Sequence, residues 1–247
     1  KFGVVRFRIR GYDADNFSTY MNGAPMENLD NGFTPFALWG GLNDVTRNRD
    51  YSHGLRTTPY AFGDVGGLQY FDTRASYQRK QTSVNYAVSN RNYVHRLMVT
   101  HSTGMNKKGW AFSVSGSRRW ANEGFTDGTF YDGWSFFGAV DKRLNDKNLF
   151  SLVAFVTPTI QGRQGAAVQE MRDIAGTNFY NPFWGYQNGK KRNASIAKTS
   201  QPVVILSHDW KINDHTSLMT AASVNWGKRG VTGLDRKSTR LNSSHRT

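Results

Sequence analysis

The chain has 247 residues and a formal net charge of +14, and 14% of its residues are aromatic while only 6 are proline. This length suits one large domain or two small ones, and the composition excludes a disordered low-complexity chain. The sequence has no cysteine, which excludes disulfides and thiolate sites, and no apolar stretch approaches the ~18 residues of a membrane-spanning helix.

Residues 1–74 are predicted to form a small α+β unit. Residues 5–10 alternate like a strand, and Asn22-Gly23 lies between two short extended runs, which is a strong signal for a type I′ hairpin. Leu38, Leu42 and Val45 have helical spacing, so a short amphipathic helix is predicted over 37–47. A glycine-punctuated stretch then leads into an extended run at 68–72.

From about residue 75 to 234 the pattern changes to alternating polar and apolar residues. Most of these segments have about ten residues, which matches the ~9–11 residues of a tilted transmembrane strand rather than the ~5–6 of a soluble one. Seven antiparallel strands are predicted, near 80–89, 92–102, 109–120, 133–143, 148–157, 201–211 and 216–226.

The third of these segments is the most informative. Trp110 and Trp120 share one face and lie ~25 Å apart along a barrel axis, which is the height of a lipid-facing band. Trp210 and Trp226 are placed in the same way, so these four tryptophans are expected at the membrane interfaces. A half-buried strand of a soluble sandwich is the alternative interpretation.

The connections between the segments also favour a membrane barrel. The fourth and sixth connections, 144–147 and 212–215, are tight, whereas the third and fifth, 121–132 and 158–200, are long. Bacterial barrels have short periplasmic turns and long outer loops.

Residues 235–247 are excluded from the fold prediction. Residues 235–245 match what the genetic code gives from a common sequencing-adapter sequence. This segment carries four cationic side chains and one carboxylate, so the net charge of the remaining chain is +11. The chain also opens inside a predicted strand without the pattern of a signal peptide, which suggests truncation or processing.

Several motifs together resemble the plug of a TonB-dependent receptor. They are the IRG run ending at Gly11, the Asn22-Gly23 hairpin, the run 60–67 with Gly63, Gly66 and Gly67, and Phe71-Asp72-Thr73-Arg74. In the later part, 89–93 and 181–189 resemble Bacteroidetes-type members. The resemblance spans about residues 5–230 and implies a mainly β fold, with the C-terminal part of an α+β plug domain followed by the first strands of an incomplete transmembrane β-barrel.

The resemblance further implies energised uptake of a scarce nutrient, such as a metal chelate or glycan, across the bacterial outer membrane. The partners implied are TonB, through a segment missing here, outer-membrane lipid and lipopolysaccharide, a small nutrient ligand and a surface lipoprotein. Arg10 resembles the plug arginine that pairs with barrel glutamates in the family; a solvated strand arginine is the equal alternative. A chain with only about seven barrel strands is not expected to transport alone.

The remaining candidates concern turns and loops. Gly11, Gly23, Gly63, Gly66 and Gly67 are interpreted as turn glycines, because their spacing fits no phosphate-binding motif. The long fifth connection is aromatic, and it offers ligand-loop candidates, with loop packing as the favoured alternative; they are Tyr180, Phe183, Trp184 and Tyr186.

No catalytic residue, metal site or cofactor is predicted. Asp13, Asp15 and Asn16 resemble the start of a calcium loop, but the required glycine and glutamate do not follow. His95 and His101 lie ~20 Å apart on one strand and cannot share an ion. The rival functions are a passive outer-membrane barrel or adhesin, a soluble basic β-sandwich binding module, and a nucleic-acid binder, which the scattered distribution of Lys and Arg argues against.

Overall fold

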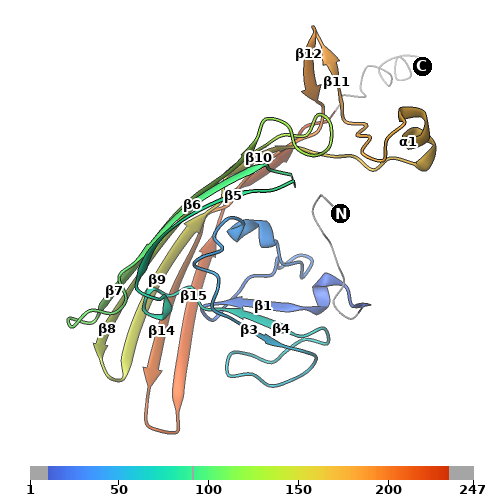
Figure 1. The fold of residues 1–247 in the computed structure, drawn as a ribbon. Helices are drawn as coiled ribbons and strands as arrows, with labels where there is room; N and C mark the ends of the chain where they lie inside the picture. The colour runs from blue at the N-terminus through green and yellow to red at the C-terminus, as the bar shows by residue number, and fades with distance from the viewer. Residues whose placement is uncertain (1–10, 91, 234–247) are drawn as a thin grey trace, which may run out of the picture.

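The computed structural model describes residues 11–90 and 92–233. It consists of a small N-terminal domain that lies on the concave side of a large, strongly curved antiparallel sheet (Figure 1). The predicted strand over residues 5–10 lies outside the described residues.

The N-terminal domain is built on a four-stranded sheet in the order β2-β1-β4-β3. Its strands are β1 (Ser18–Met21), β2 (Ala24–Pro25), β3 (Arg49–Ser52) and β4 (Leu68–Phe71). The predicted hairpin is confirmed, because Met21 pairs with Ala24 and both turn residues, Asn22 and Gly23, have positive φ. The extended run at 68–72 is confirmed as β4, which pairs in parallel with β1.

The helix predicted over 37–47 is wrong. A single 3₁₀ turn, η3 (Phe36–Trp39), is followed by turns, because Gly41 adopts a φ of +88° that ends helical geometry. Leu38, Leu42 and Val45 are nevertheless all buried. The spacing therefore identified the buried residues correctly while the glycines set a different backbone. Two further 3₁₀ turns are η2 (Ala14–Asn16) and η4 (Ala75–Tyr77).

The large sheet begins with four long strands that pair in sequence order. They are β5 (Gln81–Val88), β6 (His95–Ser102), β7 (Trp110–Ala121) and β8 (Tyr131–Asn145). The remaining pieces are β9 (Asn148–Val156), β10 (Thr159–Gly162), β13 (Ile196–Ser200), β14 (Val203–Lys211), β15 (Ser217–Asn225) and β16 (Lys228–Val231).

These six pieces form three continuous strands. The partners Phe136↔Val156 and Gly133↔Thr159 keep one register across the break between β9 and β10, and the same holds for β13–β14 and β15–β16. Pro158 and Pro202 lie in two of the breaks, and proline has no N–H to donate to the ladder. The sheet therefore has seven long strands, and the predicted number is confirmed.

The fifth connection is shorter than predicted and has structure of its own. Strands β10 and β13 occupy both ends of the predicted loop 158–200. Between them lie a short helix, α1 (Gln169–Ala175), and a hairpin of β11 (Trp184–Gln187) and β12 (Lys190–Asn193). In Figure 1 the hairpin and the helix project beyond one end of the sheet, away from the N-terminal domain.

The hydrophobic core lies between the two parts. Buried side chains of the N-terminal domain pack in one cluster with inward-facing residues of the sheet; the cluster includes Met21, Leu42, Val45 and Phe71 from the domain and Phe137, Val153, Phe155, Val203 and Ile205 from the sheet. Burying each such side chain contributes roughly 1.5–3 kcal/mol, so this shared core holds the domain against the sheet. No helix of the described residues is long and apolar enough to cross a membrane.

Candidate functional site

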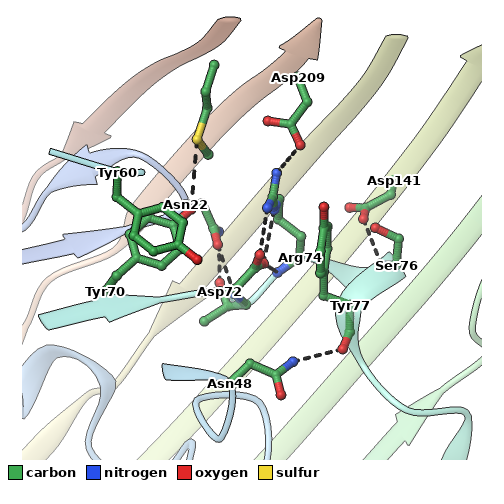
Figure 2. Close-up of polar contacts among 12 residues, drawn as sticks. Asn22, Asn48, Tyr60, Tyr70, Asp72, Arg74, Ser76, Tyr77, Asp141 and Asp209 are labelled. Carbon is green, nitrogen blue, oxygen red and sulfur yellow. Dashed lines mark hydrogen bonds and ion pairs between the residues drawn. The ribbon is translucent and has the colours of Figure 1, made fainter. Parts of the chain in front are cut away.

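The contact between the N-terminal domain and the sheet centres on a buried arginine. Arg74 follows β4, is 5% exposed, and binds Asp72 through Nε and Nη2 at 2.9 and 2.6 Å. Its Nη1 forms an ion pair with Asp209, an inward-facing residue of β14. Figure 2 shows Arg74 between the two carboxylates, with the Tyr77 ring beside it. The centre of that ring is 4.3 Å from the guanidinium carbon. One arginine thus ties the domain to the sheet.

The surroundings of Arg74 favour its charged form. Burial acts to lower the pKa of Arg74, but the bonds to Asp72 and the charge of Asp209 outweigh burial and raise that pKa above its ordinary value. Burial raises the pKa of the neighbouring Tyr70, which stacks on Tyr60 with ring centroids 3.6 Å apart. A hydrogen bond to Asp50 raises the pKa of Tyr60 to about 12. Both phenols therefore stay neutral, and Arg74 stays charged, at physiological pH.

Two further carboxylates bridge the domain and the sheet. Asp141 of β8 is fully buried and accepts the backbone N–H of Ser76 at 2.7 Å. Asp44 of the domain accepts hydrogen bonds from Ser83 and Asn85 of β5 at 2.8 and 3.0 Å. Buried carboxylates cost free energy unless they are hydrogen-bonded, so these contacts also fix the position of the domain.

A second set of contacts holds η3, at the edge of the domain. Side chains of the inner wall donate hydrogen bonds to backbone carbonyls of residues 37–41: Ser117 to Gly41, Ser135 and Arg119 to Gly40, and Thr157 to both Ala37 and Leu38. We call these donors the carbonyl clamp. The clamp adds a partner to the Ala37 carbonyl, which also accepts the N–H of Gly40, and supplies side-chain donors to the carbonyls of Leu38, Gly40 and Gly41 at the end of the short 3₁₀ turn.

Thr157→Val is expected to lower the free energy of unfolding by about 1–2 kcal/mol. Valine keeps the shape of threonine but removes the Thr157 hydroxyl from the carbonyl of the buried Leu38 and from the carbonyl of Ala37. Thr220→Val, on the exposed outer face of β15, is the matched control and should change little. Denaturant unfolding of the full-length gene product in detergent measures both. Equal stability of the two variants would show that the clamp does not hold η3.

The convex face of the sheet is apolar, in contrast to the inner wall. Exposed residues alternate with buried ones over much of β7, β8, β9 and β14, and the exposed set includes Val114, Phe136, Leu152 and Leu206; Val224 of β15 is exposed as well. Trp110 and Trp210 lie near one end of the strands, Trp120 lies at the other end of β7, and Trp226 lies at the break between β15 and β16. Trp134, which the prediction missed, lies beside Arg118 in register with it. The alternating sequence pattern of β8 places Trp134 on the outward face, so it could have been predicted as an outward-facing tryptophan.

The turn glycines occupy positions that side chains would disturb. A Cβ on Gly63 or Gly66 would come within 2.8 Å of Gly54 O or 2.5 Å of Asn16 O. Gly67 combines a φ of +126° with a Cβ position 2.3 Å from Ser52 O, and Gly23 has a φ of +86° in the hairpin turn. Gly11 has a φ of +85° and open space around it.

The aromatic candidates of the fifth connection lie at the far end of the sheet. Trp184 packs against Gly128 and stacks under Lys191, whose Nζ is 4.4 Å from the ring. Lys191 also pairs with Glu123 and Asp127, so the hairpin is fixed to the preceding loop. Phe183 lies near Gly165, and Tyr180 is half-buried. Tyr186 is 72% exposed on the projecting hairpin.

Arg10, the sequence candidate for the link to the barrel, lies outside the described residues. The described link, Arg74 with Asp209, was not among the candidates, although Arg74 belongs to the FDTR run. The second sign of this link in the sequence was Asp209, a charged residue in a strand of alternating apolar residues, 203–211. Among residues 11–90 and 92–233, no group of three or more His, Cys, Asp or Glu could hold a metal ion.

Several solved structures share this fold. The chain superposes on the siderophore receptor PiuA from Acinetobacter baumannii with a TM-score of 0.59 and 14% identity, covering 91% of this chain and 30% of that one. The unliganded ferric citrate transporter FecA superposes with a TM-score of 0.63 and 10% identity, covering 90% of this chain and 33% of that one. The open form of the ferric-catecholate import receptor Fiu from E. coli K12 superposes with a TM-score of 0.61 and 12% identity, with the same two coverages.

The chain thus spans about a third of the length of these structures. No protein-family profile matches it, and no curated protein matches its sequence. The predicted fold class is confirmed: a mainly β chain in which a small domain precedes seven antiparallel strands of an incomplete barrel.

Proposed function

We propose that this chain is part of a TonB-dependent receptor that takes up a scarce nutrient across the bacterial outer membrane. The observation that carries the proposal is the domain held in the concavity of a long-stranded sheet, with Arg74 and the carbonyl clamp as its attachments. The solved structures with this arrangement are named as siderophore, ferric citrate and ferric-catecholate receptors or transporters.

The two faces of the sheet support placement in a membrane. The outward face is apolar with tryptophans near both ends, whereas the inner wall carries small hydroxyl side chains such as Ser113, Ser115 and Ser117. Lipid on the outside and a polar lumen on the inside explain this division. In a soluble β-sandwich two sheets face each other, while the described residues form one large sheet around a domain.

The domain also distinguishes the proposal from a passive barrel. A domain lodged in the lumen blocks diffusion, so passage requires that it move or open, and the energy for this would come from TonB. The Bacteroidetes-type assignment and a lipoprotein partner at the outer loops rest on the sequence resemblance.

The test uses the full-length gene product in a Gram-negative host, with and without TonB. We expect recovery in the outer-membrane fraction with heat-modifiable mobility, and accumulation of a ⁵⁵Fe-labelled chelate only when TonB is present. Recovery in the soluble fraction would reject the membrane assignment. Accumulation that is equal without TonB would favour the passive barrel.

A further inference from the structure

The convex face of the sheet changes character toward the end that carries the projecting hairpin (Figure 1). Across the middle of the strands this face is apolar, with Phe136 and Leu152 among its exposed residues. Nearer the hairpin it carries three cationic side chains, Arg118 of β7, Lys198 of β13 and Lys228 of β16. We call these three residues the cationic belt.

The alternation of the strands places the two lysines on the convex face. Lys198 alternates with Ala197 and Thr199, which line the hollow between the N-terminal domain and the sheet, so Lys198 points away from the domain. Lys228 points the same way, because its neighbour Arg229 lines that hollow. Both lysines therefore face the surroundings of the sheet.

The two lysines are close enough to share one ligand. Lys198 pairs with Gly230, so Lys228 is its diagonal neighbour across β13 and β16, ~7–8 Å away. Both side chains are exposed, and neither forms an ion pair within residues 11–90 and 92–233. Like charges at this distance repel each other. An anion between the two ammonium groups would remove that repulsion and accept hydrogen bonds from both.

Aromatic rings hold the third cation of the belt in place. Arg118 pairs in register with Trp134, and its guanidinium carbon lies 4.9 Å from the centre of that ring and 5.4 Å from that of Trp120. Its Nε donates to Asp132 at 3.3 Å, and both side chains of this pair are more than two-fifths exposed. Within the described part of the chain, the two Nη groups of Arg118 have no hydrogen-bond acceptor, so they can bind an anion.

A pocket of about 350 Å³ adjoins the belt. Ile196 lines it and is two residues from Lys198, so the pocket and the belt share the convex face. The exposed Arg192 also lines the pocket, and it forms no ion pair with the described residues. The carboxylate in the lining, Glu123, is already paired with Lys191. The pocket thus adds one more uncompensated cation beside the belt.

The belt lies at the end of the sheet that faces out of the cell in the proposed function. The tight turns after β8 and β14 lie at the opposite end, whereas the long connection with the β11–β12 hairpin lies at this one. Bacterial barrels have short periplasmic turns and long outer loops. Membrane tryptophans lie at the level of the lipid headgroups, so Trp120 and Trp134 place the neighbouring Arg118 at that level in the outer leaflet.

We propose that the cationic belt binds a phosphorylated glycolipid of the outer leaflet through its phosphate groups. This inference rests on the proposed function and assigns a site on the face turned away from the N-terminal domain. Lys198 and Lys228 bind one phosphate, and Arg118 binds a second, because phosphate oxygens accept charge-assisted hydrogen bonds from both kinds of side chain. Three strand spacings separate Arg118 from Lys198, about 15 Å, which a disaccharide headgroup with a phosphate at each end can span. The acyl chains then lie along the apolar residues of the same face.

The test uses the purified full-length receptor in detergent and native mass spectrometry, which counts the lipids that remain bound. The probes are diphosphorylated lipid A, monophosphorylated lipid A and phosphatidylcholine. We expect the diphosphorylated lipid to bind most tightly and phosphatidylcholine most weakly, with the difference shrinking as salt rises. Inorganic phosphate in large excess should not displace the lipid, because it lacks the acyl chains.

The double variant Lys198→Gln/Lys228→Gln should weaken binding of diphosphorylated lipid A roughly tenfold, which is about 1.4 kcal/mol. The matched control is Lys107→Gln/Lys147→Gln, which removes the same charge from exposed turns at the opposite end of the sheet and should leave the affinity unchanged.

Three outcomes overturn the inference. The parent could bind phosphatidylcholine as tightly as lipid A, the double variant could bind lipid A as tightly as the parent, or inorganic phosphate could displace the lipid, which would assign the site to a soluble anion. Any of these together with TonB-dependent uptake would leave the proposed function standing. Conversely, the expected lipid preference together with uptake that is equal without TonB would keep the lipid site and reject the receptor function.

Discussion

Replacing Arg74 with methionine is expected to loosen the N-terminal domain from the sheet and to cost about 3 kcal/mol of unfolding free energy. Methionine keeps the length of the side chain but leaves Asp72 and Asp209 without their shared cation. Breaking a buried ion pair costs about 3–5 kcal/mol. The low end applies because the Asp209 side chain is 31% exposed and partly solvated. The readouts are denaturant unfolding in detergent and sensitivity of the host to a bulky antibiotic.

Three companion variants separate the ion pair from general damage. Arg74→Lys keeps the charge but loses the two-pronged contact with Asp72, so it should fall between parent and methionine. Adding Asp209→Leu to Arg74→Met should recover part of the loss, because the second carboxylate is no longer left without a cation. Lys211→Met breaks the exposed pair with Asp214 and should cost less than 1 kcal/mol, as surface pairs do. A loss as large for Lys211→Met would contradict the assignment of Arg74 as the link.

Gly67→Ala is expected to be the most damaging single change in the N-terminal domain, with a loss above about 4 kcal/mol. Its φ of +126° is strained for any residue with a Cβ, and that Cβ would lie 2.3 Å from the carbonyl oxygen of Ser52. The obstacle is backbone of β3, which pairs with β4, so it cannot move aside without breaking the sheet. The Gly67 carbonyl also accepts the N–H of Ser18 at the start of β1.

Gly138→Ala is the matched control for this change. Gly138 lies within β8, and a Cβ built there meets nothing within 4 Å. We expect normal yield and unchanged stability for this variant, and a poorly folded or protease-sensitive product for Gly67→Ala. Limited proteolysis of outer-membrane preparations compares the two. Normal protease resistance of Gly67→Ala would mean that the turn between β3 and β4 tolerates a different backbone.

The strands could be predicted from the sequence because the outward face is apolar over their middle. Residues 110–117 alternate between exposed or half-buried and buried positions, and the predicted and observed bounds of this strand differ by a single residue at each end. The alternation fades beyond the apolar stretch. Both faces of β13 and β16 carry polar residues such as Lys198, Thr199 and Arg229, so nothing in their pattern distinguished them from a loop.

The site was less predictable because it depends on distant pairings. Arg74 and Asp209 are separated by 135 positions, and only the fold of the sheet around the domain brings them together. The same holds for Thr157 and the carbonyls of η3, which no local pattern connects. The helix predicted over 37–47 does not form for a local reason. Gly41 has a positive φ that ends helical geometry, and the helical spacing of the apolar residues concealed this.

The shared core has a mechanical consequence. The N-terminal domain packs against the sheet through one cluster that includes Met21, Leu42 and Phe71. Removing the folded domain in one step would expose all of these side chains to water at the same time. Exposing each side chain to water costs roughly 1.5–3 kcal/mol. Removing the domain in one step would therefore need a force large enough to break all of these contacts together. Peeling the chain strand by strand exposes them one after another, with a far lower peak force. A pulling force applied to this domain would therefore unfold it strand by strand more readily than displace it as a rigid body.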